Sequence, residues 1–339
     1  MKLFSKKDEK KTEKERVEER REEVLAAGRK FKYPLQWTRH RIVVNTILIA
    51  LVVITMIIVG GYLALYRIGM TDELLFRVTR AIPVPVATVD DEDVRFSDYL
   101  MFYRSSMTSI ERQSGSQFDE SSYTALRDEY KRIALSEAEE YAYAAKLAKE
   151  LDITVSDEEV AIEFDRHLKI GGIDRSEEGF IKIIEDNFGL TKSEYERMLY
   201  LTLVKAKVEM EIDETANKLA NKVESLLASN GNNYQAVAEQ LGDEIIYEET
   251  GGLVDSKNID GGRASEAMKL EPEQSSGRFV SMNGDGYYFV KLIKKTNSEV
   301  NFVSIKVPFT EFNKRFESLR EGGKIVEYIE IPDSEQAGQ

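Results

Sequence analysis

The sequence contains no cysteine and only two histidines, His40 and His167. Without cysteine the chain can form no disulfide, no thiolate nucleophile and no Cys-based metal site. Two histidines far apart in the sequence also argue against a Ser-His-Asp centre or a multi-histidine zinc site. We therefore predict no catalytic, cofactor-binding or metal-binding residues, and no cofactor.

Charge is missing from one long apolar run, Ile42 to Tyr66. A helix of these 25 residues rises about 37 Å, which is enough to cross a hydrocarbon core of about 30 Å. A cleavable signal peptide is the alternative, but its apolar core spans only about 7–15 residues and ends in a small-residue cleavage site. The run ends instead in Leu65-Tyr66-Arg67, and we predict a permanent single-pass anchor in the cell membrane.

Charge also divides the chain into two unequal parts. Residues 1–41 contain 14 Lys/Arg and 8 Asp/Glu, a balance of +6, so the rest of the chain carries −20 of the total −14. Because a positive flank stays in the cytoplasm, we predict a cytoplasmic N-terminus and an extracytoplasmic bulk. Trp37, Tyr62 and Tyr66 would then lie at the two interfaces, with His40 in the interfacial flank. No nucleic-acid partner is expected, because so acidic an external part repels phosphates.

The external part is long enough for one large or two ordinary domains, and its composition changes along the chain. A helical region is followed by a glycine-rich region of mixed helices and strands, so the predicted fold class is α+β. We predict a charged cytoplasmic tail (1–41), a transmembrane helix (42–66), a connector (67–82), a mostly helical domain (83–212), an α/β domain (213–296), a C-terminal strand-helix-strand segment (297–331) and a tail (332–339).

Several elements follow from local patterns. Ser97 is predicted to cap a helix that runs to about Gln113, and a longer helix begins near Ser121. Two capping boxes, Ser156 to Glu159 and Thr191 to Glu194, predict two later helix starts. Further helices are predicted at about 176–187, 213–227, 234–241 and 310–319, with strands at 86–89, 279–282, 287–292, 300–307 and 324–331.

His167 follows the first capping box, among Glu163, Asp165 and Arg166 on a helical surface. We predict a solvated or locally paired residue there, not a catalytic one. Four apolar residues of the helical domain are instead candidates for a cleft that holds unfolded chains, with ordinary core packing as the alternative. These are Tyr99, Phe102, Tyr103 and Met107.

The stretch Val86–Leu100 (VATVDDEDVRFSDYL) resembles the opening of the SurA/PrsA/PpiD-type periplasmic chaperones. Ile153–Val160 and Gly189–Tyr195 resemble two later helix starts of the same N-terminal domain, in the same order, so that the resemblance covers about residues 83–212. It implies a membrane-anchored, foldase-like chaperone of the bacterial cell envelope. Its partners would be unfolded or nascent secreted polypeptides, with the translocation machinery as a further contact.

Residues 213–296 resemble a degenerate parvulin, the prolyl isomerase domain of these chaperones, at Asn233–Leu241, Ala267–Val280 and Gly286–Leu292. The sequence differs from the parvulin family at the positions of the residues that catalyse prolyl isomerisation. The family's last-strand histidine falls on Tyr288, and its first-strand motif has only a late counterpart without histidine, Phe302–Lys306. The two apolar residues of the proline cradle fall on Ile259 and Arg263.

Prolyl isomerisation needs a desolvated pocket to ease rotation about a bond with a barrier of about 20 kcal/mol. We therefore expect the parvulin fold to be kept and its activity to be lost. Two alternatives stay open, an active isomerase with a rearranged site and a scaffold protein of an envelope complex. The helix with Phe309, Phe312, Phe316 and Leu319 either completes the helical domain or caps the sheet.

Overall fold

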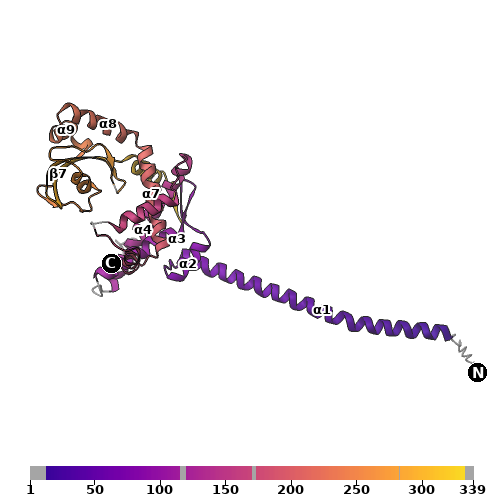
Figure 1. The fold of residues 1–339 in the computed structure, drawn as a ribbon. Coiled ribbons are helices and arrows are strands. Elements are labelled where there is room, and N and C mark those ends of the chain that lie inside the picture. Colours follow the sequence, from indigo (N-terminus) through magenta and orange to yellow (C-terminus); the bar gives the residue numbers. More distant parts are fainter. Residues whose placement is uncertain (1–12, 115–119, 170–172, 282, 333–339) are drawn as a thin grey trace, which may run out of the picture. The chain divides into compact units, whose positions relative to one another are not determined.

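The structure is a computed structural model that describes residues 13–114, 120–169, 173–281 and 283–332 (Figure 1). The chain divides into two compact units, Met1–Ala64 and Leu65–Gln339. The first unit is dominated by one helix, α1 (Glu13–Tyr62), which is followed by a π-helical turn, η1 (Leu63–Arg67). Within the described residues, His40–Arg67 is the one segment long and apolar enough to cross a membrane.

The end of the apolar run differs from the prediction. Leu65 is buried in the core of the second unit, and the ring of Tyr66 meets Phe96 edge-to-face at 5.7 Å. The hydroxyl of Tyr66 donates a hydrogen bond to the carbonyl of Pro85, at 2.6 Å. Tyr66 therefore packs against protein. The side chain of Trp37 lies outside the described residues.

The first part of the second unit, here called the helical part, is built on three long helices. Among them, α4 packs against both α3 and α7. Its elements are α2 (Glu73–Ala81), β1 (Pro85–Val89), β2 (Glu92–Arg95), α3 (Phe96–Ser114), α4 (Glu120–Glu150), α5 (Asp157–Leu168), α6 (Glu177–Phe188) and α7 (Lys192–Ile212).

The helix starts follow mostly from the capping pattern. In the first box, Ser156 and Glu159 satisfy each other's backbone N–H groups, and in the second the carboxylate of Glu194 accepts from the N–H of Thr191 at 2.8 Å. The predicted cap at Ser97 is wrong, because α3 already begins at Phe96. The predicted connector also contains a helix, α2, that we did not expect.

The second part, here called the sheet part, contains an antiparallel sheet of order β3-β7-β6-β5, with β4 also paired to β7. Helices α8 and α9 pack on one face around Phe289 and Ile305, and α10 packs on the other around Val290 and Leu292 (Figure 1). The elements are α8 (Glu214–Ser229), α9 (Tyr234–Leu241), η3 (Gly242–Glu244), β3 (Ile246–Glu249), β4 (Val254–Asp255), α10 (Arg263–Met268), β5 (Phe279–Val280), β6 (Gly286–Lys295) and β7 (Glu299–Pro308). The α+β class is confirmed.

The chain then returns to the helical part through α11 (Glu311–Glu321) and β8 (Ile325–Glu327). Strand β8 pairs antiparallel with β1 to complete a small sheet of order β2-β1-β8. Phe312 and Phe316 are buried against Tyr143 of α4, with ring centroids 5.3 and 6.0 Å away. Of the two alternatives for this helix, the structure shows the one in which it completes the helical core. Only Phe309 joins the core of the sheet part.

Candidate functional site

A cleft of about 920 Å³ opens between the helical part and the sheet part, within the second unit. Helices α4, α5 and α7 form one wall, and α10, β5 and the turn that follows β5 form the other. Both walls present apolar side chains that are half-buried or exposed, namely Tyr141, Met198, Leu203, Phe279 and Val280. Apolar groups that remain accessible on two facing walls are what an extended polypeptide segment would contact.

One end of the cleft is closed by the turn before β6. Gly284 has φ +71°, and a Cβ atom on it would lie 2.8 Å from the Cβ of Ala206 on α7. The turn therefore needs glycine for its backbone and for its approach to the helix. Asp285 fixes the turn, because its carboxylate accepts hydrogen bonds from Ser281 and Lys306. The backbone of the sheet part thus approaches α7 closely at this point.

His167 lies on the rim of the cleft and is paired locally, as predicted. Its Nε2 is 3.3 Å from Glu163, and its Nδ1 shares a hydrogen bond with the hydroxyl of Tyr195. Burial opposes ionisation of Glu163, but the hydrogen bond from His167 and the charge of Arg166 prevail and lower its pKa. The arrangement is an ion-pair network along the rim.

The remaining charges at the cleft are largely balanced. Burial raises the pKa of Glu137 to about 7, with Glu140 adding to the shift and Lys205 opposing it. Across the cleft, Glu266 is paired with Lys269. Because acids and bases neutralise each other, the walls favour no strong charge in a bound segment. Such a cleft suits polypeptides of varied sequence.

The four candidates predicted for the cleft do not line it. Tyr99, Phe102, Tyr103 and Met107 are only 2–6% exposed and belong to the core of the helical part. The alternative reading, ordinary core packing, is the one that the structure supports. Met198 and Leu203 fall in the helix predicted from the second capping box, and Phe279 and Val280 fall in the strand predicted at 279–282, but no pattern indicated that these segments face each other.

Tyr288, predicted to stand in place of the family's histidine, has charged side chains beside it. Tyr288 is buried in β6, with the guanidinium carbon of Arg263 5.4 Å and the Nζ of Lys306 5.7 Å from its ring centre. Arg263 also pairs with Glu248. The segment Phe302–Lys306 lies on β7 beside β6, and Lys306 is the register partner of Tyr288.

The residues predicted at the proline cradle form no apolar pocket. Ile259 is 74% exposed, and the recess of about 450 Å³ beside Arg263 is lined by Glu248 and Asp260 as well as by Phe302. Burial raises the pKa of Tyr288, and the nearby carboxylate of Asp285 adds to the shift while Lys306 and Arg263 oppose it. Within the part of the chain that the structure describes, no cluster of acidic or histidine side chains could hold a metal ion.

The comparison with known families bears on the first half of this architecture. Residues 35–209 match the model of the SurA-like N-terminal domain, just over half of the chain. The match runs from the middle of α1 nearly to the end of α7, and so includes the wall of the cleft formed by α4, α5 and α7. No curated protein matches the chain.

Proposed function

Because the chain belongs to the family with a SurA-like N-terminal domain, we propose that it is a membrane-anchored extracytoplasmic chaperone that holds unfolded or newly translocated polypeptides. The family suggests a periplasmic chaperone-type role. The segment His40–Arg67 supplies an anchor of sufficient length and apolar character. The basic flank before it supports a cytoplasmic N-terminus, which leaves the cleft outside the membrane on the far side.

The observation that carries the proposal is the cleft with apolar side chains on both walls. Its volume of about 920 Å³ admits a short stretch of extended chain but not a folded domain. Burial of apolar surface contributes about 25 cal/mol per Å², while an unfolded segment loses entropy when it is ordered. Binding should therefore be weak and reversible, as release of a client requires.

We further propose that the sheet part is a degenerate parvulin in which β7, which follows β6 in the chain, takes the place of the family's first strand. Supporting this, β7 lies in the middle of the sheet between β3 and β6, although it is the last strand of this sheet in the sequence. A tyrosine and two cations occupy the place of an apolar proline pocket, so the domain would position clients without isomerising them.

The test is an aggregation-suppression assay with residues 65–339. The fragment should begin at Leu65, because Leu65 and Tyr66 pack in the core and a shorter fragment would lose them. We expect it to delay the aggregation of several unrelated unfolded proteins. A folded fragment that delays none of them, yet captures one stoichiometric envelope protein, would contradict the chaperone proposal and favour a scaffold.

The orientation of the chain across the membrane can be tested separately. Protease added after the outer layer of intact cells is permeabilised should digest the chain beyond about residue 70, as the basic flank predicts. Protection of the C-terminal region under these conditions would place the cleft in the cytoplasm and contradict the proposed localisation.

A further inference from the structure

The outer side of α2 carries apolar side chains with no protein contact to bury them. Leu74 is 70% exposed, and Val78 and Ile82 follow it at four-residue intervals with 43% and 61% exposure. The chain leading into α2 adds Ile68 and Met70, which are also exposed. We call these five residues the α2 face. Such a row of apolar side chains normally faces a partner or a membrane.

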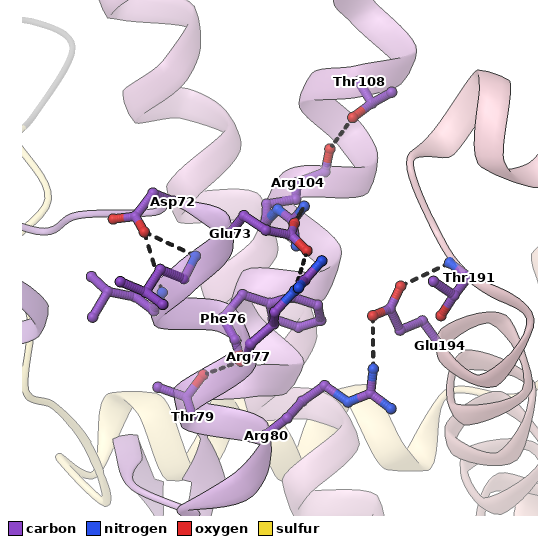
Figure 2. A network of polar contacts seen from close by, with 12 residues as sticks. Asp72, Glu73, Phe76, Arg77, Thr79, Arg80, Arg104, Thr108, Thr191 and Glu194 are labelled. Atoms are coloured by element: carbon purple, nitrogen blue, oxygen red, sulfur yellow. Dashed lines mark hydrogen bonds and ion pairs between the residues drawn. The ribbon is translucent and has the colours of Figure 1, made fainter.

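The inner side of α2 is tied to the helical part, as Figure 2 shows. Glu73 pairs with Arg104, whose guanidinium carbon lies 4.7 Å from the ring centre of the buried Phe76. Arg80 reaches the N-terminus of α7, where it pairs with Glu194 at 2.8 Å. Because these contacts fix the rotation of α2 about its axis, the α2 face cannot turn inward to bury itself.

The chain length places α2 close to the end of the anchor, however the two units are arranged. Because Leu65 is already buried in the core of the helical part, only residues 65–72 separate the lipid-facing part of the anchor from Glu73. Nine extended steps, from Ala64 to Glu73, span at most about 32 Å, and the polar layer on each side of a bilayer is about 5–8 Å thick. Helix α2 is therefore the first element beyond the membrane and lies within reach of its interfacial layer.

We propose that the α2 face lies in the interfacial layer of the membrane that holds the anchor, and so sets the orientation of the helical part above the bilayer. The inference rests on the proposed membrane anchor. Leu74 and Val78 would enter the boundary between headgroups and acyl chains, with Arg77 at its polar edge. The anchor makes this contact intramolecular, so three or four apolar side chains suffice where a free helix of this length would not stay bound.

The absence of native cysteine makes a direct test simple. Single-cysteine variants Leu74→Cys and Val78→Cys of the full chain are labelled with an environment-sensitive fluorophore and reconstituted into vesicles of phosphatidylethanolamine and phosphatidylglycerol. In one preparation part of the lipid carries a nitroxide near the headgroup, which tests residues 74 and 78, and in a second it carries the nitroxide deep in the acyl chain, which tests residue 54. Ile54→Cys, within the anchor, is the positive control, and Val326→Cys, an exposed valine on β8, is the matched control for a water-facing site.

We expect nitroxide lipid to lower the fluorescence about twofold or more at residues 74 and 78, and to leave residue 326 unchanged. Quenching at residue 54 without quenching at 74 or 78 would overturn the inference and leave the anchor in place. No quenching at residue 54 would overturn the anchor, and the inference with it. A blue shift at residue 74 that depends on protein density and not on lipid would assign the α2 face to a second copy, and would also overturn the inference.

Discussion

The carboxylate of Asp213 accepts a hydrogen bond from the backbone N–H of Thr310, with Oδ2 and N 2.7 Å apart. The same oxygen accepts from Glu311, at 3.0 Å, and the other oxygen accepts from Ala216, at 2.8 Å. Asp213 is only 1% exposed. One buried carboxylate thus caps both α8, where the chain leaves the helical part, and α11, where it returns.

Replacement of Asp213 by alanine should therefore weaken two helix starts at once. A single N-cap contributes about 0.5–2 kcal/mol, so we expect Asp213→Ala to lower the free energy of unfolding by about 1–4 kcal/mol. Asn233→Ala, which removes one cap hydrogen bond at α9, is the control and should cost no more than one cap. Chemical denaturation of residues 65–339 measures both. Equal losses in the two variants would show that Asp213 caps only one helix effectively.

Glu139 on α4 is fully buried beside the C-terminal segment. Burial raises its pKa to about 8, the carboxylates of Glu327 and Glu140 add to the shift, and Arg320 opposes it. A carboxyl group whose pKa is higher in the folded than in the unfolded state binds its proton mainly in the folded state. Its contribution to stability is therefore complete at acid pH and is lost as the pH rises from about 4.5 to about 8.

We accordingly expect stability to fall across this interval, by at most about 1.4 kcal/mol per pH unit from this group. Glu139→Gln keeps the shape but cannot ionise, so it should flatten the dependence and raise stability most at pH 8. Glu150→Gln, on the exposed end of the same helix, is the control and should keep the wild-type profile. Chemical denaturation at several pH values measures this dependence. If the free energy of unfolding of Glu139→Gln fell with pH as steeply as that of the wild type, the prediction would be contradicted.

Local patterns in the sequence were sufficient for most elements of the fold. The capping boxes at Ser156 and Thr191 fixed two helix starts, because a cap is satisfied by residues three positions apart. Apolar spacing is a less accurate guide to the buried face of α4, because Ile133 in the middle of this helix is 44% exposed. That helix packs against α3, α7 and the C-terminal segment together, so its buried face is set by three neighbours that the periodicity does not reveal.

The cleft could not be predicted in the same way. Met198 and Phe279 belong to segments that we had predicted correctly as helix and strand, yet their approach across the cleft depends on the tertiary arrangement of two parts. The cluster around Tyr99 was predicted either as a client-binding cleft or as core, because large apolar residues are equally typical of both. Helix α2 was missed because the sequence there had been read only as a linker between two larger segments.

The cleft can be tested by placing a charge in it. Val280 is 38% exposed on the sheet wall, so Val280→Glu should fold normally and bring an unpaired carboxylate to the apolar surface. A central contact of this kind contributes about 1–2 kcal/mol, and we expect affinity for unfolded clients to fall about five- to thirty-fold. Val326→Glu, on β8 away from the cleft, is the matched control. Similar losses in both variants would locate client binding elsewhere.

Client binding should also depend on both parts of the second unit. The sequence had suggested that recognition lies mainly in residues 83–212, but the cleft takes one wall from the sheet part. Replacing residues 214–308 by a short linker removes the whole sheet part but keeps Asp213 at the start of α11, and should therefore weaken binding about as much as Val280→Glu. If the deletion variant bound clients as tightly as the intact protein, client binding would reside in the helical part alone.

The sheet part should not catalyse prolyl isomerisation. With Tyr288 between Arg263 and Lys306, we expect residues 65–339 to leave the cis/trans relaxation of a proline peptide at its uncatalysed rate, tens of seconds or slower. Fluorescence or protease-coupled peptide assays measure this directly. An acceleration that disappears in Tyr288→Ala would reveal an active isomerase with a rearranged site and refute the proposed loss of activity.

The C-terminal segment should stabilise the helical part and not the sheet. Phe312 and Phe316 stack on each other and on Tyr143, and each is 2% exposed. Phe316→Ala would leave a cavity that costs about 3–5 kcal/mol. We expect amide hydrogen exchange to accelerate in α4 while β6 stays protected, because α11 packs on α4. Ile305→Ala, in the core of the sheet part, should give the reverse pattern. Faster exchange in β6 but not in α4 after Phe316→Ala would show that the segment supports the sheet instead.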